Sequence, residues 1–349
     1  MIDEKKVVKK YGINMVLCAG IIGMSGLFIF YGMDSLVLGA ILITAVVFLF
    51  NLLLLSLSSM LNSCFEIKEW LKKTGSTVLL VFNVLTAVCG LVYIVQDGMM
   101  FNNVHDEESR IYLQSLEGYH EIAFTGENGK TYHGMMYRES DEIAPLVIYF
   151  GGNGEVSYRN LRNRGDKNDW QYYPGCHYLY IDYDGYGLNE GRPHYRNMYE
   201  MALAAYDYAV TLPYVDNERI VVMAFSLGTG NAIYLAANRP VAGLITATPY
   251  ASGYDLYNGM LPIFYGPMRL LVKQKLPSSE YAPKVNCPVL VIASKRDEAI
   301  PFASSLRIAE LFGGDVDFMT LENVSHNNTF KAEGVLEKIQ SFIVGVTGK

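Results

Sequence analysis

Short apolar runs alternate with longer amphipathic stretches from about residue 104 onward, and this alternation restricts the fold more than any other feature. Apolar runs of about four to eight residues suit strands buried on both faces, and amphipathic stretches suit covering helices. Strands are predicted at 119–125, 131–138, Pro145–Phe150, Tyr178–Ile181, Ile220–Phe225, Ala242–Ala247, Val289–Ala293 and Asp317–Leu321. Helices are predicted near 155–166, 197–211, 227–238, 302–313 and 331–343. This order predicts an α/β domain built on a doubly wound, mostly parallel sheet.

The first hundred residues have a different composition. Three long apolar runs, at about 13–32, 36–57 and 77–95, contain no Lys, Arg, Asp or Glu. A helix that crosses the hydrocarbon core needs about 20 apolar residues, and a charge at its centre would cost about 2.5–3.5 kcal/mol. We therefore predict a membrane region over 1–103 with three transmembrane helices in contact with lipid, followed by the α/β domain over 104–349. A cleaved signal peptide over the first run and buried soluble helices are the alternatives.

Lysines indicate how these spans are oriented. The N-terminus carries four lysines and the loop between the second and third runs carries Lys68, Lys72 and Lys73, whereas the turn around Asp34 has none. Because positive residues stay on the cytoplasmic side, the N-terminus and this loop are predicted inside and the α/β domain outside.

Charge and cysteine content exclude several classes of function. The net charge of −7 argues against nucleic-acid binding, which needs a basic surface to neutralise phosphate. The five cysteines form no CxxC or Cys/His cluster, so the sequence indicates no disulfide framework, metal site or cofactor. We expect buried or partly buried free thiols.

One predicted strand is followed by a serine between small residues. The sequence Ala224-Phe225-Ser226-Leu227-Gly228 fits the pattern G-x-S-x-G, with Ala in place of the first Gly. The strand-to-helix turn in this pattern is so tight that its flanking residues must be small, and it holds the serine oxygen out of the sheet. Ser226 is the predicted nucleophile.

An acid and a histidine follow the last two predicted strands. Asp297 begins the segment 297–301, where a carboxylate can orient an imidazole. Glu298 is the local alternative for this role, and an N-cap for the next helix is the structural alternative for Asp297. His326 is the one histidine among six that follows Ser226 in the chain. It completes the order Ser, Asp, His that this arrangement of strands requires.

A glycine-rich loop, 151–154, follows the strand Pro145–Phe150. Without side chains in the way, its backbone amides can face an incoming oxyanion, and we predict the N–H groups of Asn153 and Leu227 as the two donors. A phosphate-binding loop is the alternative, but no Lys-Ser or Lys-Thr follows these glycines.

Together these motifs resemble the α/β-hydrolase superfamily over about residues 115–345, and more narrowly its serine aminopeptidase-like and lysophospholipase-like branch. The segments that carry the resemblance are Tyr149–Gly154, Asp182–Gly187 with Gly191–Pro193, Ser226–Gly228 and Asp297–Pro301. The resemblance implies the α/β-hydrolase fold and acyl transfer by Ser226, His326 and Asp297. The family usually has His at Gly151, Arg at Asp184 and Gly at Ala224. These departures affect neither the three residues Ser226, Asp297 and His326 nor the two oxyanion donors. They make it less safe to carry the family's substrate specificity over to this chain.

The predicted function is therefore that of a serine hydrolase that forms an acyl-enzyme. A carboxylic ester is the first expected substrate class, with thioesters and amides as alternatives. Between the strand ending near Thr248 and the strand beginning at Pro288, an apolar insertion is predicted to form a small cap. Its candidate substrate-binding residues are Tyr250, Met260 and Phe264, although ordinary helix packing explains most of its side chains equally well.

A membrane-anchored domain with such a cap favours lipid or long acyl ester substrates. An aminopeptidase-like peptidase and a non-catalytic scaffold are the alternative functions. Two N-glycosylation acceptor sequences, 323–325 and 327–329, flank His326, where a glycan would obstruct the site. An outward-facing domain therefore fits the outer side of a bacterial cell membrane better than a secretory lumen.

Overall fold

The computed structural model describes residues 100–162 and 175–348, together with isolated positions between 77 and 98. The chain divides into two compact units, Met1–Met99 and Met100–Lys349. The three predicted membrane spans lie outside the described residues, apart from isolated positions in the third. No helix within the described part of the chain has the length and apolar character that a membrane crossing requires.

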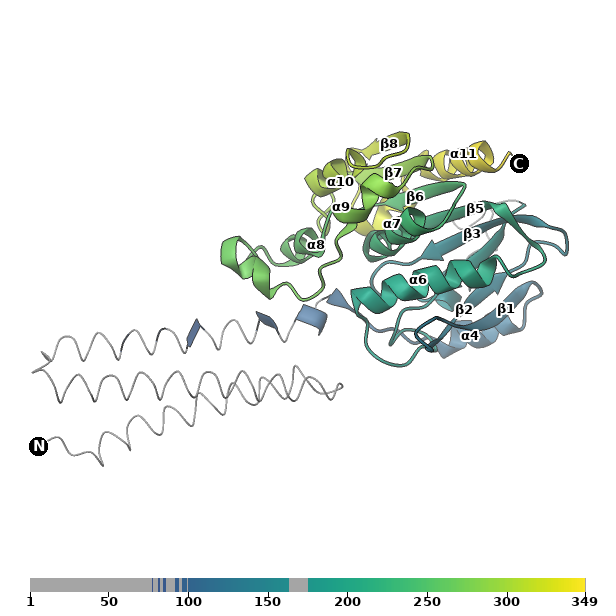
Figure 1. Cartoon of the computed structure of the whole chain (residues 1–349), viewed down its shortest axis with the longest axis horizontal. Helices are drawn as coiled ribbons and strands as arrows, with labels where there is room; N and C mark the ends of the chain where they lie inside the picture. Colours follow the sequence, from purple (N-terminus) through teal and green to yellow (C-terminus); the bar gives the residue numbers. More distant parts are fainter. Residues whose placement is uncertain are drawn as a thin grey trace, which may run out of the picture. The chain divides into compact units, whose positions relative to one another are not determined.

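The second unit is built on an eight-stranded sheet in the order β1-β2-β4-β3-β5-β6-β7-β8 (Figure 1). The strands are β1 Tyr119–Thr125, β2 Thr131–Tyr137, β3 Ala144–Phe150, β4 His177–Ile181, β5 Val215–Phe225, β6 Gly243–Ala247, β7 Val289–Ser294 and β8 Val316–Leu321. β2 pairs antiparallel with β1 and with β4, and all other neighbours are parallel. Every residue of β3, β4, β6 and β7 is buried, as expected for strands covered on both faces. The predicted doubly wound, mostly parallel sheet is confirmed.

Helices and 3₁₀ turns connect these strands. They are α4 Glu107–Gln114, α5 Ser157–Arg162, α6 Tyr195–Ala209, η1 Ser226–Gly228, α7 Thr229–Asn238, α8 Gly253–Met260, η2 Gly266–Leu271, α9 Ser278–Tyr281, η3 Ala282–Lys284, α10 Phe302–Ala309, η4 His326–Lys331 and α11 Val335–Thr347. α6 packs against α7, which also contacts β3, β5 and β6, and α11 packs against β5 and β6. Because β3 to β8 run parallel, their carboxyl ends lie at one edge of the sheet, where the loops after β3, β5, β7 and β8 meet.

Several predicted boundaries differ from the observed ones for local reasons. β5 begins at Val215 rather than Ile220, because its first residues pair with β3 across a register shift between Ala144 and Leu146. α11 begins at Val335 rather than 331, because Gly334 adopts a left-handed backbone with φ 77°.

The helix α4 was not predicted from the sequence. Its N-terminus is capped by Asp106, whose carboxylate accepts the backbone N–H of Ser109. The predicted helix 155–166 is described only from Ser157 to Arg162 as α5, because residues 163–174 lie outside the described part of the chain.

The predicted cap is the segment between β6 and β7, and it consists of α8, η2, α9 and η3 (Figure 1). Buried side chains hold it to the domain, among them Leu256, Tyr257, Phe264 and Leu276. Two of the five cysteines lie in the described part of the chain. Both are free thiols, Cys176 buried and Cys287 half-buried, as predicted, and burial raises the pKa of Cys287 to about 11.

Candidate active site

Ser226 lies in a strained turn at the carboxyl end of β5. Its backbone is left-handed, with φ 48°, in a region that non-glycine residues rarely occupy. Small neighbours make the turn possible, since a Cβ on Gly228 would stand 2.2 Å from the carbonyl oxygen of Phe150. Ala224, in place of the usual Gly, fits without exposure at the end of β5. Strain of this kind costs about 1–3 kcal/mol and is common where a side chain must be presented to a site.

Three predicted side chains form a continuous hydrogen-bonded relay. His326 Nε2 lies 2.8 Å from Ser226 Oγ, and His326 Nδ1 lies 2.9 and 2.8 Å from the two carboxylate oxygens of Asp297. All three side chains are nearly buried, so the relay is largely shielded from solvent. The structure therefore brings together residues separated by 100 positions in the chain.

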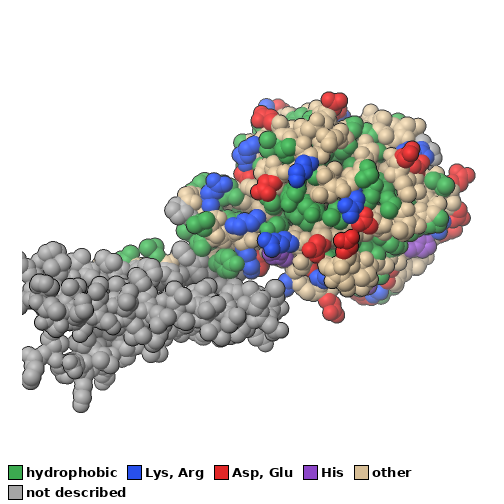
Figure 2. Space-filling model, in the orientation of Figure 1, with side chains coloured by type: hydrophobic (Ala, Val, Ile, Leu, Met, Phe, Trp, Pro, Cys, Tyr) green, Lys and Arg blue, Asp and Glu red, His purple; other side chains and the backbone are tan. Residues whose placement is uncertain are grey.

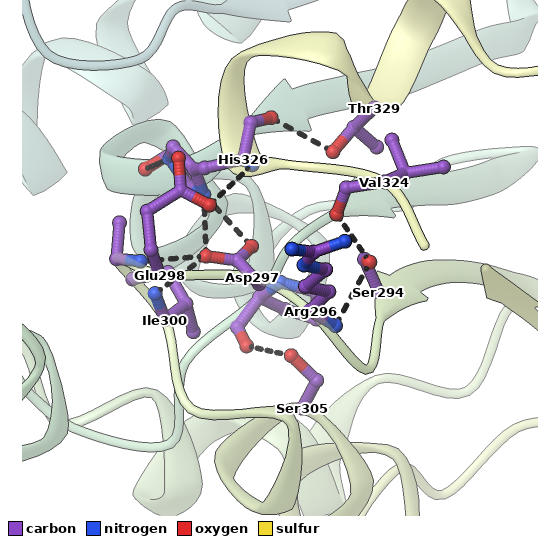
Figure 3. Close-up of polar contacts among 12 residues, drawn as sticks. Ser294, Arg296, Asp297, Glu298, Ile300, Ser305, Val324, His326 and Thr329 are labelled. Carbon is purple, nitrogen blue, oxygen red and sulfur yellow. Dashed lines mark hydrogen bonds and ion pairs between the residues drawn. The ribbon is translucent and has the colours of Figure 1, made fainter. Parts of the chain in front are cut away.

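The contacts of Asp297 and Glu298 separate the two candidate acids. Asp297 Oδ1 also accepts the backbone N–H groups of Ala299 and Ile300, each at 2.8 Å, which fixes the carboxylate toward the imidazole (Figure 3). Glu298 is exposed, and its carboxylate accepts the backbone N–H of His326 at 3.1 Å rather than a ring nitrogen. Asp297 thus orients the ring, and Glu298 supports the loop. Asp297 is not the N-cap of α10, a position that Pro301 occupies.

The histidine loop is held from both sides. The Ser294 hydroxyl donates to the carbonyl of Val324 at 2.5 Å, and the Thr329 hydroxyl donates to the carbonyl of His326 at 2.9 Å (Figure 3). The Phe225 ring packs against the imidazole with ring centroids 5.0 Å apart. These contacts limit the imidazole to the orientation that reaches Ser226.

The glycine-rich loop 151–154 lies beside the serine. A Cβ on Gly152 would stand 2.7 Å from the Phe225 ring and 3.6 Å from Ser226 Cβ. The N–H of Gly152 donates to Glu155 Oε2 at 2.7 Å, so this amide is already engaged. The carboxyl of Glu155 is buried, which raises its pKa. The side chain of Asn153, the predicted donor residue, accepts from Asn102 N and Tyr186 Oη at 2.6 and 2.9 Å.

Two buried tyrosine hydroxyls hold the carbonyl groups next to the predicted donors. Tyr183 Oη donates to the carbonyl of Gly151, and Tyr250 Oη donates to the carbonyl of Leu227 at 2.9 Å. Both tyrosines are buried. The Gly151–Gly152 and Leu227–Gly228 peptide groups are therefore held by side chains from the loops after β4 and β6. This arrangement suits donors that must not reorganise as charge develops.

The three predicted substrate-binding residues have different settings. Tyr250 is fully buried, and its hydroxyl donates to the carbonyl of Leu227. Phe264 is buried within the cap, where its ring lies 5.4 Å from that of Tyr257. Met260 is 38% exposed at the end of α8. Their role in substrate binding stays a prediction.

The buried carboxylate of Asp184, where the family usually has Arg, forms an ion pair with the half-buried side chain of Lys130. Asn197 Nδ2 donates to the same carboxylate at 3.1 Å. The departure at Gly151 is explained by its neighbour Tyr180, because a Cβ at Gly151 would stand 1.9 Å from the Tyr180 hydroxyl. The departures at Asp184 and Gly151 thus change local packing and leave the relay intact.

Sequence reasoning did not find the supporting roles of Phe225, Glu155, Tyr183 and Tyr250. Phe225 occupies the variable position before the serine, and Tyr183 belongs to the segment Asp182–Gly187 that carried the resemblance. Tyr250 was predicted from the sequence as a substrate-binding residue, and Glu155 gave no recognisable signal.

Comparisons with known proteins agree with this fold. The model of the dienelactone hydrolase family matches residues 191–333, which include Ser226, Asp297 and His326. The chain is 31% identical over 168 residues to the α/β hydrolase domain-containing protein aho-3 of Caenorhabditis elegans, covering 48% of this chain and 49% of that protein. It is 32% identical over 171 residues to an uncharacterised protein of Mycobacterium tuberculosis, covering 48% of this chain and 60% of the relative. The chain belongs to the α/β-hydrolase superfamily.

Solved structures share the fold of the α/β domain. The acetyl xylan esterase 1 of Thermoanaerobacterium has a TM-score of 0.52 at 16% identity, covering 71% of this chain and 96% of the esterase. An esterase of Pyrococcus furiosus has a TM-score of 0.55 at 15% identity, covering 71% of this chain and 97% of the esterase. The chain spans about half the length of the curated relatives it matches, 49% to 60%. The narrower aminopeptidase-like and lysophospholipase-like branch stays a prediction.

Two hollows in the second unit are not lined by the predicted nucleophile. One of about 690 Å³ lies under the cap and one of about 600 Å³ lies beside Glu298, and Ser226 lines neither. Among the described residues no group of three or more His, Cys, Asp or Glu side chains could hold a metal ion.

Proposed function

We propose that this α/β-hydrolase is a serine hydrolase that cleaves a carboxylic ester through an acyl-enzyme. The observation that carries the proposal is the relay from Asp297 through His326 to Ser226, with each step at 2.8 Å. The matching family is named for hydrolysis of a lactone, which is a cyclic ester.

In the proposed reaction His326 takes the proton of Ser226 as the serine oxygen attacks the carbonyl carbon. Asp297 stabilises the imidazolium, and the N–H groups of Asn153 and Leu227 donate hydrogen bonds to the oxyanion. His326 then protonates the leaving group, and the ester bond breaks. Water, deprotonated by the same imidazole, cleaves the acyl-enzyme and restores Ser226.

We further propose that three N-terminal spans anchor the hydrolase in a membrane, with the α/β-hydrolase domain on the outer side of a bacterial cell. The proposal rests on the three charge-free apolar runs and on the distribution of lysines around them. It favours lipid or long acyl esters as substrates. Alkaline phosphatase fused after residue 349 is expected to be active in bacteria, because the enzyme works on the outer side of the membrane. An inactive phosphatase fusion, together with a fluorescent fusion of green fluorescent protein at the same position, would show that the domain lies on the cytoplasmic side instead.

Labelling with a fluorophosphonate probe tests the nucleophile. The wild-type protein is expected to label, and the Ser226→Ala variant is expected not to. The variant Ser305→Ala serves as the control, because the Ser305 hydroxyl is buried and donates to the carbonyl of Pro249 rather than to a member of the relay. A folded wild-type protein that does not label would favour the alternative of a non-catalytic hydrolase-fold scaffold.

A panel of p-nitrophenyl esters of increasing acyl length, compared with aminopeptidase substrates, tests the substrate class. Rates that rise with acyl length would support lipid-like esters. Cleavage of aminoacyl amides in preference to esters would favour the aminopeptidase-like alternative.

A further inference from the structure

The cap carries apolar side chains that the domain does not cover. Leu270 is 83% exposed and Tyr265 is 57% exposed, and Met260 at the end of α8 is also exposed. We define the cap tip as residues 260–270. Because soluble surfaces rarely group large exposed apolar side chains without a partner, the cap tip requires an explanation.

Buried neighbours show that this exposure is imposed by the fold. Phe264 is buried next to exposed Tyr265, and its backbone N–H is held by Asn258 Oδ1 at 3.0 Å. Val272 and Leu276 are buried on the other side of Leu270. The cap is thus anchored on both sides of the tip, and its outward side chains are presented by a fixed backbone.

Aromatic and cationic side chains are interleaved at the cap tip. The Tyr265 ring meets the Tyr254 ring edge to face at 6.3 Å, and the Arg269 guanidinium lies over the Tyr254 ring at 4.3 Å. Leu270 follows Arg269 directly. Figure 2 shows hydrophobic and cationic side chains together on the end of the hydrolase unit that carries the cap. Such a surface combines apolar groups with positive charge, as do protein segments that bind at the interface between lipid headgroups and acyl chains.

The charge of the cap is opposite to that of the chain. Residues 256–279 contain Arg269, Lys273 and Lys275 and no acidic residue, whereas the chain carries a net charge of −7. Asp255, just before this segment, pairs with Arg307 at 2.5 Å. The whole cap, which also contains Asp255, Glu280 and Lys284, still carries a net charge of +2.

The cavity of about 690 Å³ at the base of the cap continues this cationic surface. Its lining includes the cationic side chains of Arg196, Arg269 and Lys275 and the carboxylates of Glu200 and Glu280. The hollow beside the tip is therefore net cationic as well.

We propose that the cap tip docks on a lipid surface with anionic headgroups. Leu270, Tyr265 and Met260 enter the boundary between headgroups and acyl chains, and Arg269 and Lys275 bind the lipid phosphates. This docking involves the cap alone and requires neither the catalytic role of Ser226 nor the N-terminal spans.

Fluorescence of the full-length protein tests this docking. Tryptophan is introduced as Leu270→Trp, at an exposed position that tolerates a large side chain, and the protein is reconstituted with phosphatidylcholine vesicles that contain brominated acyl chains. Ile143→Trp is the matched control, because Ile143 is 59% exposed just before β3, at the opposite edge of the sheet. The wild-type chain, with its two tryptophans, gives the background. Quenching is expected to be about twofold stronger at position 270 than at position 143.

Adding phosphatidylglycerol tests the charge. It is expected to increase quenching at position 270, and the additional changes Arg269→Gln and Lys275→Gln are expected to remove that increase. Equal quenching at positions 270 and 143 would overturn the proposal. A tryptophan at 270 that is shielded from aqueous iodide but not quenched by brominated lipid would also overturn it, and would indicate a protein partner or a second copy of this chain.

Discussion

The Tyr250 hydroxyl donates a hydrogen bond to the carbonyl of Leu227 over 2.9 Å, inside a fully buried environment. Leu227 is the residue after the nucleophile, and its N–H is a proposed oxyanion donor. Because a donor contributes most when it is held in place before charge develops, Tyr250 is a positioning residue rather than a catalytic one.

Tyr250→Phe is expected to lower kcat about tenfold, less than the loss of a donor itself, with KM nearly unchanged. Tyr199→Phe is the matched control, because the Tyr199 hydroxyl is buried and has no hydrogen-bond partner among the described residues. Steady-state kinetics on one p-nitrophenyl ester measures both variants. Equal losses in the two variants would assign Tyr250 a general packing role instead.

Ser226→Ala is expected to lower kcat by about 10⁶-fold, because the nucleophile is lost. Ser226→Gly removes the same hydroxyl and also accommodates φ 48° without strain. We expect the Gly variant to unfold with a free energy about 1 kcal/mol higher than the Ala variant. Urea unfolding compares the two, and a less stable Gly variant would show that the turn stores no strain.

Asp297→Asn is expected to lower kcat about 10⁴-fold, because the amide would orient the imidazole in the wrong tautomer. Glu298→Gln is expected to change kcat only slightly, since Glu298 contacts the backbone N–H of His326 and not its ring. Single-turnover rates of acylation distinguish the two acids. A larger loss for Glu298→Gln would exchange their roles.

Gly228→Ala is expected to cost about 3 kcal/mol of stability, because its Cβ would stand 2.2 Å from a backbone oxygen that cannot move aside. Ala224→Gly restores the usual residue of the family at the other small position of the turn. It is expected to keep activity and to cost about 1 kcal/mol, through lost packing and chain entropy. Thermal unfolding and ester hydrolysis test the pair.

Burial raises the pKa of Asp182 to about 7, although its carboxylate accepts the backbone N–H and hydroxyl of Ser157. The folded protein therefore binds this proton more tightly than the unfolded chain, in which the pKa is about 3.9. The stabilising contribution is complete below about pH 4 and is lost as the pH rises toward 7, on the order of 4 kcal/mol in all. Asp182→Asn is expected to flatten the urea stability profile between pH 4 and 7. An unchanged slope would show that Asp182 is ionised throughout this range.

Local pattern was sufficient for the sheet and for the relay. The strands alternate with helices in sequence, and fully buried strands such as β3 and β7 are continuous apolar runs, so their existence could be predicted from hydrophobicity alone. Ser226, Asp297 and His326 could be predicted because each follows a strand whose carboxyl end lies at the same edge of the sheet. Helix α4 and the early start of β5 could not be predicted from the sequence, because they depend on a capping hydrogen bond and on a register shift.

The sequence by itself determined the class of fold and predicted the candidate nucleophile Ser226 with His326, because periodicity and chain order are properties of the sequence. It left two acids, Asp297 and Glu298, as candidates to orient His326. Only the tertiary structure showed which carboxylate faces the imidazole, since the direction of a side chain depends on loops brought together from distant parts of the chain. Asp297 faces the imidazole and Glu298 the backbone, and Tyr250 turns inward to Leu227 while Tyr265 and Leu270 of the same cap face outward.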